Sequence, residues 1–410
     1  MNDWELTILS EICDFTVGHV SSMAHAYVAS GITFLRSQNI HPYILKLDDV
    51  KFINEEFHRK LKKSELRPGD VVVVRTGYPG TACVIPESLE TSNCADLVII
   101  RPSSKVNPHY LSAVFNSTWG KSLVAGRLVG AAQQHFNVGA AKSMELRIPP
   151  RGTQDQIAKT LCDFNDLIET NDRAIVQLEE MARLLYRAWF VDFKFPGHER
   201  VELVDSGHPD FGTIPEGWSV SELSSIAFLN YGKALKAEDR THGPFPVYGS
   251  SGIVGRHDSF LVEGPGIIVG RKGNVGATYY SPTNFYPIDT VYYVSREQST
   301  PFAFQTLKSF KFLSGDAAVP GLNREYAHSR KVLTPSNELV SQYNILASVF
   351  RLLLDNTISQ NICLMEMRDL LLPKLLSGEI DLTELPNAPS GVNGTNSSAS
   401  QPRDYERVRQ

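Results

Sequence analysis

The chain repeats itself over a long stretch, and this repeat constrains its fold more than any other feature. Residues 149–193 and 335–379 align without a gap at an offset of 186, so that Phe164 matches Phe350. A repeat of this length indicates two copies of one structural unit in a single chain. We therefore predict a molecule with approximate two-fold symmetry.

Weaker matches precede each copy of the repeated segment. Residues 75–80 (Arg-Thr-Gly-Tyr-Pro-Gly) match residues 271–276 (Arg-Lys-Gly-Asn-Val-Gly), and Asn137 matches Asn323. These matches lie among short runs of β-branched and aromatic residues, which are typical of strands in small mixed domains. The sequence therefore predicts a globular domain before each repeated segment.

The repeated segments themselves have the hydrophobic spacing of long helices. From Ile157 to Trp189 the residues follow an unbroken 4-3-4-3 spacing, which is the a/d seam of a coiled coil, and the second copy has the same positions from Tyr343 to Leu375. Polar residues in a seam cost stability but can fix the register of a helix pair. We predict that the two helices form an antiparallel coiled coil, with Asn171, Thr357 and Asn361 as polar seam residues.

The predicted fold class is α+β, with two pseudo-symmetric α/β domains, each followed by a long helix. The segment after Leu382 is rich in Pro, Gly, Ser and Asn, a composition typical of disorder. The predicted boundaries are 1–150 for the first domain, 151–195 for the first helix, 196–216 for a linker, 217–336 for the second domain, 337–382 for the second helix and 383–410 for a disordered tail.

Composition argues against several classes of protein. No run of about 18 apolar residues could span a membrane, and the N-terminus lacks a basic start followed by an apolar stretch. The five cysteines form no Cys-x-x-Cys pair, and the 11 histidines show no metal-binding spacing. We therefore expect reduced thiols, no metal site and a cytoplasmic location.

The net charge of −5 is unevenly distributed along the chain. Residues 1–150 carry 15 Lys/Arg against 14 Asp/Glu and residues 216–335 carry 12 against 10, whereas 151–215 carry 7 against 12 and 336–410 carry 6 against 9. A polyanion would therefore approach the two domains, and the acidic helices would face another partner.

Several segments imitate catalytic motifs without completing one. Residues 107–110 read Asn-Pro-His-Tyr, one residue away from the Asn-Pro-Pro-Tyr motif of adenine methyltransferases, but the comparable place in the second copy reads Thr300-Pro301. Asn and Thr share no methyl-transfer chemistry, whereas both cap helices and Pro is favoured at the next position. We predict helix caps here, and we expect no catalytic residue and no cofactor in this chain.

Polar and basic turns in the two domains are the remaining candidates for a binding surface. Arg75 and Arg271 each end a β-rich run and enter a glycine-rich turn, and arginine can donate two hydrogen bonds to guanine O6 and N7. The alternative is that both arginines brace their domains, which their presence in both copies favours. The sequence leaves the two interpretations open.

Two other groups of residues are candidates for contacting DNA. Gln133 and Gln134 are replaced in the second copy whereas Asn137 is kept, so the glutamines are candidates to bind adenine edges. A lysine cluster suits phosphates, although such clusters are usually just solvated. The full set of DNA-binding candidates is Lys60, Lys62, Lys63, Arg75, Thr76, Gln133, Gln134, His135, Tyr248, Ser250, Ser251, Arg256, Arg271, Lys272, Asn274 and Arg324.

The chain resembles a known family over about 380 residues, all but the tail. Residues 184–193 read Leu-Leu-Tyr-Arg-Ala-Trp-Phe-Val-Asp-Phe and residues 370–380 read Leu-Leu-Leu-Pro-Lys-Leu-Leu-Ser-Gly-Glu-Ile. Residues 246–252 (Pro-Val-Tyr-Gly-Ser-Ser-Gly) and 268–273 (Ile-Val-Gly-Arg-Lys-Gly) add to the likeness. With these segments the chain is similar to the specificity (S) subunit of type I restriction–modification systems.

The resemblance implies a function as well as a fold. It implies two target-recognition domains that each bind half of a split site on double-stranded DNA, and a helix pair that sets the spacing and docks two methylation subunits. Methyl transfer from S-adenosylmethionine, and restriction driven by ATP with Mg²⁺, would belong to methylation subunits and possibly restriction subunits. The expected docking residues on the helices are Leu184, Trp189, Phe190, Leu371, Leu375 and Leu376.

Two other functions stay open at the level of sequence. The first is a non-catalytic scaffold whose repeated domains bind protein or another ligand, and the second is a self-contained methyltransferase. Salt separates the first from DNA recognition, because DNA binding weakens steeply as the salt concentration rises. Cofactor binding by the isolated chain would indicate the second.

Overall fold

The computed structural model describes residues 4–23, 25–128, 135–310, 312 and 321–380. The chain divides into two compact units. Unit 1 combines residues 1–167 with 364–410, and unit 2 comprises residues 168–363. Each long helix, α5 (Arg151–Phe190) and α9 (Asn337–Ser377), therefore contributes a segment to both units.

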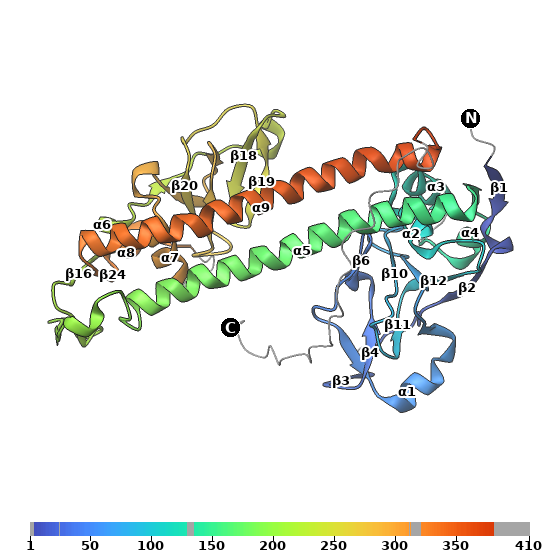
Figure 1. Ribbon diagram of the computed structural model, residues 1–410, viewed down its shortest axis with the longest axis horizontal. Coiled ribbons are helices and arrows are strands. Elements are labelled where there is room, and N and C mark those ends of the chain that lie inside the picture. The colour runs from blue at the N-terminus through green and yellow to red at the C-terminus, as the bar shows by residue number, and fades with distance from the viewer. Residues whose placement is uncertain (1–3, 24, 129–134, 311, 313–320, 381–410) are drawn as a thin grey trace. The chain divides into compact units, whose positions relative to one another are not determined.

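Unit 1 is built around a four-stranded antiparallel sheet with strand order β10-β9-β12-β2 (Figure 1). Successive side chains of a strand point to opposite faces, and the four valines of β9 are all buried. Val71 and Val73 pack under helix α2, whereas Val72 and Val74 face a second sheet. The bounds are β2 Cys13–Val17, β9 Val71–Val74, β10 Ala82–Val84, β12 Leu97–Pro102 and α2 Pro108–Asn116.

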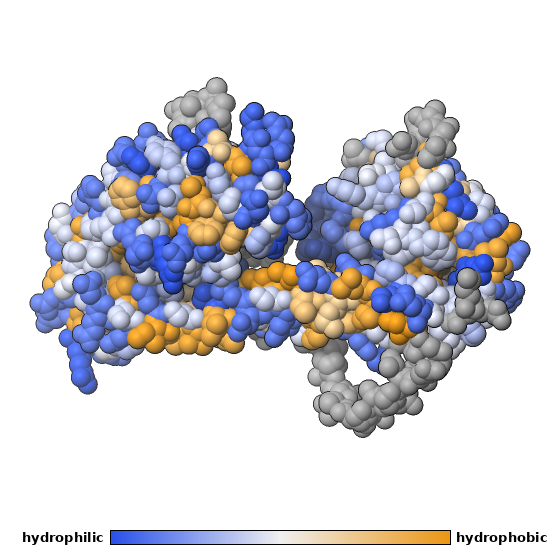
Figure 2. All heavy atoms as spheres, turned by 90° about the horizontal axis from the view of Figure 1, so that it is seen from above, coloured by the Kyte–Doolittle hydropathy of each residue, from blue (hydrophilic) through white to orange (hydrophobic). Residues whose placement is uncertain are grey.

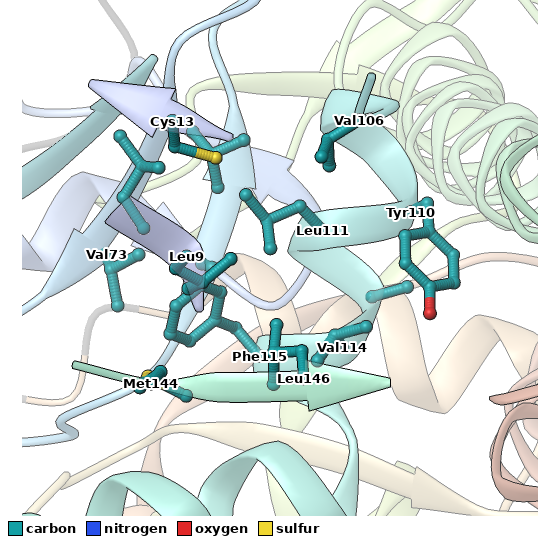
Figure 3. Close-up of a cluster of buried hydrophobic side chains, with 14 of the residues drawn as sticks. Leu9, Cys13, Val73, Val106, Tyr110, Leu111, Val114, Phe115, Met144 and Leu146 are labelled. Atoms are coloured by element: carbon teal, nitrogen blue, oxygen red, sulfur yellow. The ribbon is translucent and has the colours of Figure 1, made fainter. Parts of the chain in front are cut away.

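The core under α2 is closed by side chains from distant parts of unit 1. Figure 3 shows Leu111 and Phe115 of α2 among Leu9, Val73 and Leu146 of the surrounding elements. The second sheet has strand order β3-β7-β4-β11-β8, in which β4 and β11 run parallel. Its bounds are β3 Tyr27–Val28, β4 Ile32–Leu35, β7 Lys51–Ile53, β8 Glu65–Leu66 and β11 Ser92–Cys94.

Short elements complete unit 1. Strand β1 pairs with β13 immediately before α5, and β5 pairs with β6 in a separate hairpin. The bounds are β1 Glu5–Ile8, β5 Ile40–His41, β6 Ile44–Leu45, β13 Glu145–Ile148, α1 Glu55–Lys60, α3 Thr118–Leu128, α4 Val138–Lys142, and the 3-10 helices Leu9–Glu11, Ser37–Asn39 and Lys62–Ser64.

Unit 2 repeats the four-stranded sheet of unit 1 strand for strand, but its second sheet has three strands instead of five. Its four-stranded sheet has the order β21-β20-β23-β17, helix α7 packs on one face, and a three-stranded sheet with order β19-β18-β22 contains the parallel pair β18–β22. Strands β16 and β24 pair just before α9. The bounds are β16 Ser219–Glu222, β17 Asn230–Tyr231, β18 Phe245–Gly249, β19 Gly252–His257, β20 Gly266–Gly270, β21 Thr278–Ser281, β22 Tyr286–Pro287, β23 Val291–Val294, β24 Lys331–Thr334, α6 Leu223–Ile226, α7 Pro301–Ser309 and α8 Arg324–Ser329, with 3-10 helices at Ala237–Asp239 and Arg296–Gln298.

The internal repeat extends to single backbone hydrogen bonds. In the β9–β10 turn the Gly80 N–H donates to Val74 O at 3.1 Å, and in the β20–β21 turn the Gly276 N–H donates to Gly270 O at 2.9 Å. Both glycines have a positive φ, of 92° and 79°, which side chains disfavour. The weak sequence match between these two turns therefore reflects one shared backbone conformation.

The helix caps predicted from the sequence are confirmed. The Asn107 side chain accepts hydrogen bonds from the N–H groups of His109 and Tyr110, and Pro108 follows as the first helical residue of α2. Thr300 accepts from the Ala303 N–H at the start of α7, again with a proline next in the chain. The methyltransferase-like motif is therefore a helix start.

In each unit the start of one long helix packs against the end of the other, as an antiparallel pair. In unit 1, Ile157 and Leu161 of α5 share a core with Leu372 of α9, near the C-terminus of that helix. In unit 2, Phe190 at the end of α5 shares a core with Tyr343 near the start of α9. The predicted seam is therefore buried at these positions.

A polar seam residue links the two helices within unit 2. Asn361 is 3% exposed, and its side-chain amide donates to Asp172 Oδ1 at 2.8 Å and to Ile168 O at 3.3 Å. A shift of one helix along the other would leave this buried amide without partners, which is costly. Asn361 thus favours one register of the pair.

Two predicted helix ends need correction, and the predicted linker contains regular structure. The first helix ends at Phe190 rather than at 195, because the chain turns at Phe193, which has a φ of 55°. The predicted linker 196–216 contains a hairpin of β14 (Leu203–Asp205) and β15 (Thr213–Pro215) and a 3-10 helix, His198–Arg200. The second helix ends at Ser377 rather than at 382, and the predicted tail lies outside the described residues.

A buried histidine should make unit 2 sensitive to pH. His328 Nε2 accepts a hydrogen bond from the Leu229 N–H at 2.9 Å, and burial followed by the nearby Arg324 charge lowers the pKa of His328. As the pH falls below about 6.5, His328 therefore binds a proton in the unfolded chain while it stays neutral in the folded chain. The free energy of unfolding should decrease in this range of pH. Urea unfolding at pH 7.5 and 5.5 measures this loss.

His328→Gln provides the matched control for this prediction. Its side-chain oxygen can accept the same N–H without titrating, so the variant should lose less stability between the two pH values than the natural chain. An equal loss in both proteins would contradict the assignment to His328.

Candidate nucleic-acid interface

In unit 1, the β9–β10 turn holds Arg75 in place. Arg75 donates through Nη1 to Asp96 Oδ1 at 3.2 Å and through Nε to Phe136 O at 3.3 Å. The same guanidinium is therefore tied to two other segments of unit 1. This arrangement supports the interpretation that Arg75 braces the domain.

The next residue of that turn is exposed and pairs with a second candidate. Thr76 Oγ1 lies 2.9 Å from His135 Nδ1, which joins two DNA-binding candidates that are far apart in the sequence. Gln133 and Gln134, which precede this histidine, lie outside the described residues. The structure thus brings Thr76 and His135 together at the surface of unit 1.

The sequence analysis missed an aromatic residue at the tip of the same turn. Tyr78 is 83% exposed between Gly77 and Pro79. A large apolar ring held out by a glycine-rich turn is available for contact with a ligand. The sequence signal for it is the glycine-rich turn itself, in which an aromatic residue stands between Gly77 and Pro79.

The three lysines of the predicted cluster have different surroundings. Lys60 forms a salt bridge with Glu56 one helical turn earlier, at 2.8 Å, so its charge is partly offset. Lys62 and Lys63 lie exposed on the following 3-10 helix. Among the described residues, no hydrogen bond or salt bridge links this cluster to the Arg75 turn.

In unit 2, two turns that carry candidates lie side by side. A β-carbon at Gly273 would stand 3.1 Å from Ser250 Oγ, so the β20–β21 turn touches the β18–β19 turn. Ser251 and Asn274 are exposed on these turns. The structure therefore gathers four of the candidates into one surface, namely Ser250, Ser251, Lys272 and Asn274.

Two arginines of unit 2 converge on one aromatic ring. The guanidinium carbon of Arg271 lies 5.0 Å from the ring centroid of Tyr231, and that of Arg324 lies 4.7 Å from the same centroid. Arg271 also donates to Asp289 O at 3.2 Å, and Lys272 pairs with the carboxylate of Asp289 at 3.7 Å. Tyr231 was not among the candidates selected from the sequence.

The structure contradicts one further candidate of unit 2, Tyr248, and leaves another, Arg256, at the surface. Tyr248 is buried in the core between the two sheets beside Phe285, and burial raises the pKa of the Tyr248 hydroxyl. Arg256 is exposed, but its guanidinium donates to Pro244 O at 2.8 Å. The prediction that Tyr248 is a DNA-binding residue is therefore wrong, because its ring packs inside the domain.

The predicted docking residues on the helices also need correction. Trp189 and Phe190 belong to the core of unit 2, and Leu375 and Leu376 to that of unit 1, so their side chains are unavailable to a partner. Leu371 is partly buried against the same core as Leu375. Of the six residues, Leu184 is the most accessible, with 48% of its surface exposed.

Exposed apolar residues lie elsewhere on the long helices, where Figure 2 shows hydrophobic side chains on the surface. Such contiguous apolar surfaces mark sites of interaction with other proteins. On the α9 segment of unit 2 the exposed large apolar residues are Ile345, Leu346, Val349, Leu352, Leu353, Ile358 and Ile362. The first five of these residues fall on one side of α9 by helical spacing, and the seam pattern did not reveal them.

The described residues contain no cluster of His, Cys, Asp and Glu suited to a metal ion. Nor do the described helices include one long and apolar enough to cross a membrane.

Comparison with known proteins places the chain in a family. The family model described as "Type I restriction modification DNA specificity domain" matches residues 1–180 and 215–356, which correspond to the two recognition domains and large parts of both helices. The chain belongs to this family of DNA specificity subunits. The resemblance noted from the sequence is thereby confirmed, and so is the α+β fold with its repeated domains.

Two curated relatives span nearly the whole chain. The specificity subunit of the type I restriction enzyme HindI from Haemophilus influenzae is 24% identical, and the alignment covers 82% of this chain and 90% of the relative. The MjaIX specificity subunit from Methanocaldococcus jannaschii is 22% identical over 93% of this chain and 95% of the relative. The crystal structure of a type I S subunit from M. genitalium shares the fold, with a TM-score of 0.57, 17% identity, and coverage of 92% of this chain and 97% of that one.

A pair of substitutions on α5 separates a core residue from a surface residue. Phe190 packs against Phe302 and Tyr343, with ring centroids 4.8 and 4.9 Å apart, so Phe190→Ala should lower the free energy of unfolding by about 3–5 kcal/mol. Leu184→Ala on the exposed side of the same helix should change it by about 0.5 kcal/mol or less. Denaturant unfolding of both variants measures the difference, and equal effects would contradict the corrected assignment.

Proposed function

We propose that this chain recognises a bipartite, asymmetric site on double-stranded DNA as the specificity subunit of a type I restriction–modification complex. The observation that carries the proposal is the pair of equivalent turns, β9–β10 and β20–β21. They share their backbone hydrogen bonds but present different side chains. The family to which the chain belongs supports DNA recognition as the role of these domains.

The difference between the two turns suggests an asymmetric target. The turn of unit 1 presents Thr76 and Tyr78, whereas the turn of unit 2 presents Lys272 and Asn274. Base edges in the major groove are distinguished by their pattern of donors, acceptors and methyl groups. Two surfaces with different donors and acceptors would therefore bind two different half-sites.

The proposed partners are two methylation subunits, and possibly restriction subunits. The exposed apolar residues of α9, with Leu184 on α5, are the surface that we assign to the methylation subunits. We place S-adenosylmethionine, ATP and Mg²⁺ on these partners rather than on this chain, and the complex in the cytoplasm. Adenine methylation and DNA cleavage would then be directed by this chain and performed by its partners.

The alternative is a non-catalytic scaffold that binds protein or another ligand. The same helix faces would suit a scaffold, but the family match covers both recognition domains and favours DNA. The alternative therefore has no observation of its own in support.

Deletion of the gene tests the proposal in the host. Mapping N6-methyladenine across the genome by long-read sequencing should show the loss of one bipartite motif in the deletion strain, and expression of the chain from a plasmid should restore it. Unchanged methylation, in a strain shown to express both this chain and its methylation subunit beforehand, would contradict the proposal.

A further inference from the structure

The cluster formed by Tyr231, Arg271 and Arg324 brings like charges together at the surface of unit 2. Tyr231 is 48% exposed, and both guanidinium groups lie within 5.0 Å of its ring centroid. The face of an aromatic ring attracts a cation, but two cations on one ring repel each other. The repulsion between the two guanidinium charges must therefore be offset by nearby carboxylates or by a ligand that presents negative or partly negative atoms.

The neighbouring carboxylates compensate this charge incompletely. Glu325 pairs with Arg324 at 3.0 Å, but its side chain is largely exposed, and exposed pairs contribute little. The Asp289 carboxylate pairs with Lys272 instead, and Arg271 receives only the Asp289 backbone oxygen. Among the residues that the structure describes, three cations (Arg271, Lys272 and Arg324) thus lie beside two carboxylates (Asp289 and Glu325).

Unit 1 shows that the fold does not require this cluster. Tyr231 pairs with Tyr292 across β17 and β23, and at the same place in unit 1 Val17 pairs with Val98 across β2 and β12. The cap residues Asn137 and Asn323 are equivalent, so Arg324 corresponds to Val138. Unit 1 therefore keeps the equivalent backbone although valine replaces Tyr231, Tyr292 and Arg324.

The arginine that both units share is also held differently. Arg75 forms a salt bridge with Asp96, whereas the equivalent Arg271 lies over Tyr231 and Tyr292, at 5.0 and 5.7 Å from the ring centroids. Contact between a guanidinium and an aromatic ring consumes none of its five N–H donors. Arg271 donates through Nη1 to Asp289 O, but no carboxylate among the described residues forms a salt bridge with it, so it keeps donors that such a bridge would occupy.

We propose that Arg271 and Arg324 are the guanine-binding residues of the second recognition domain, and that Tyr231 is the residue that positions them. Each guanidinium would donate to O6 and N7 of a guanine in the half-site bound by unit 2. This inference rests on the proposed function and adds to it the identity of the bases and of the side chains.

The test replaces cluster residues by those that unit 1 carries. Both variants are expressed with the methylation subunits in the deletion strain. Arg324→Val should relax one guanine position of the unit 2 half-site, whereas Tyr231→Val, which removes the ring under both guanidinium groups, should relax two. Since a bidentate contact contributes about 1–3 kcal/mol, discrimination at each affected position should fall about 5- to 150-fold. The unit 1 half-site should stay unchanged, which also shows that the complex assembles.

Conservative variants and a matched control separate base recognition from other roles. Tyr231→Phe keeps the ring and should retain the motif, whereas Arg324→Lys keeps the charge without the planar fork and should relax it. Arg330→Ala removes another exposed arginine of unit 2, which lies over Tyr326 rather than Tyr231, and should leave the motif intact.

Several outcomes would overturn the inference. One such outcome is that Arg324→Val lowers methylation at all sites without changing the motif, whereas Arg324→Lys keeps normal methylation. This outcome would indicate that Arg324 contacts a phosphate. A motif that no cluster variant alters would exclude the cluster from recognition. If the natural chain itself supports no motif in this strain, the proposed function fails instead, so the two failures are distinguishable.

Discussion

The packing of α5 against α9 is the interaction on which both units depend. In unit 1, Ile157 of α5 and Leu375 of α9 lie in the same core as Val73 of the central sheet. In unit 2, Phe190 and Tyr343 share a core with Phe302 of α7. Neither recognition domain therefore closes its core without both helices, so the orientation of each sheet is fixed to its helix segments by hydrophobic contact.

The repeat and the seam were predictable because they depend on local spacing. The 4-3-4-3 pattern from Ile157 predicted α5, and the match between Asn107 and Thr300 predicted two helix caps that the structure confirms. Helix ends were less predictable. Beyond the end at Phe190 the chain turns at Phe193, and the rings of Phe193 and Phe195 pack on Trp218 at centroid distances of 5.3 and 5.6 Å, a contact that no local pattern encodes.

The candidate surface was predicted only in part, because a residue type does not reveal its neighbours. Arg75 and Arg271 occupy equivalent turns, yet one is bound by Asp96 and the other lies over Tyr231. The importance of Tyr231 depends on strand pairing with Tyr292, which spans more than sixty positions of the chain. Apolar residues of a buried seam and of an exposed docking face look alike in sequence. For this reason the sequence predicted Trp189 as a docking residue, whereas its ring lies in the core of unit 2.

The central claim is that two equivalent domains, each attached to the same kind of helix, bind different half-sites independently. The most direct measurement exchanges residues 1–150 for the first domain of another specificity subunit, keeps α5 from Arg151 onward, and maps genomic methylation. The account predicts that one half of the methylated motif changes while the other half stays the same. A change in both halves, or in neither, would contradict it.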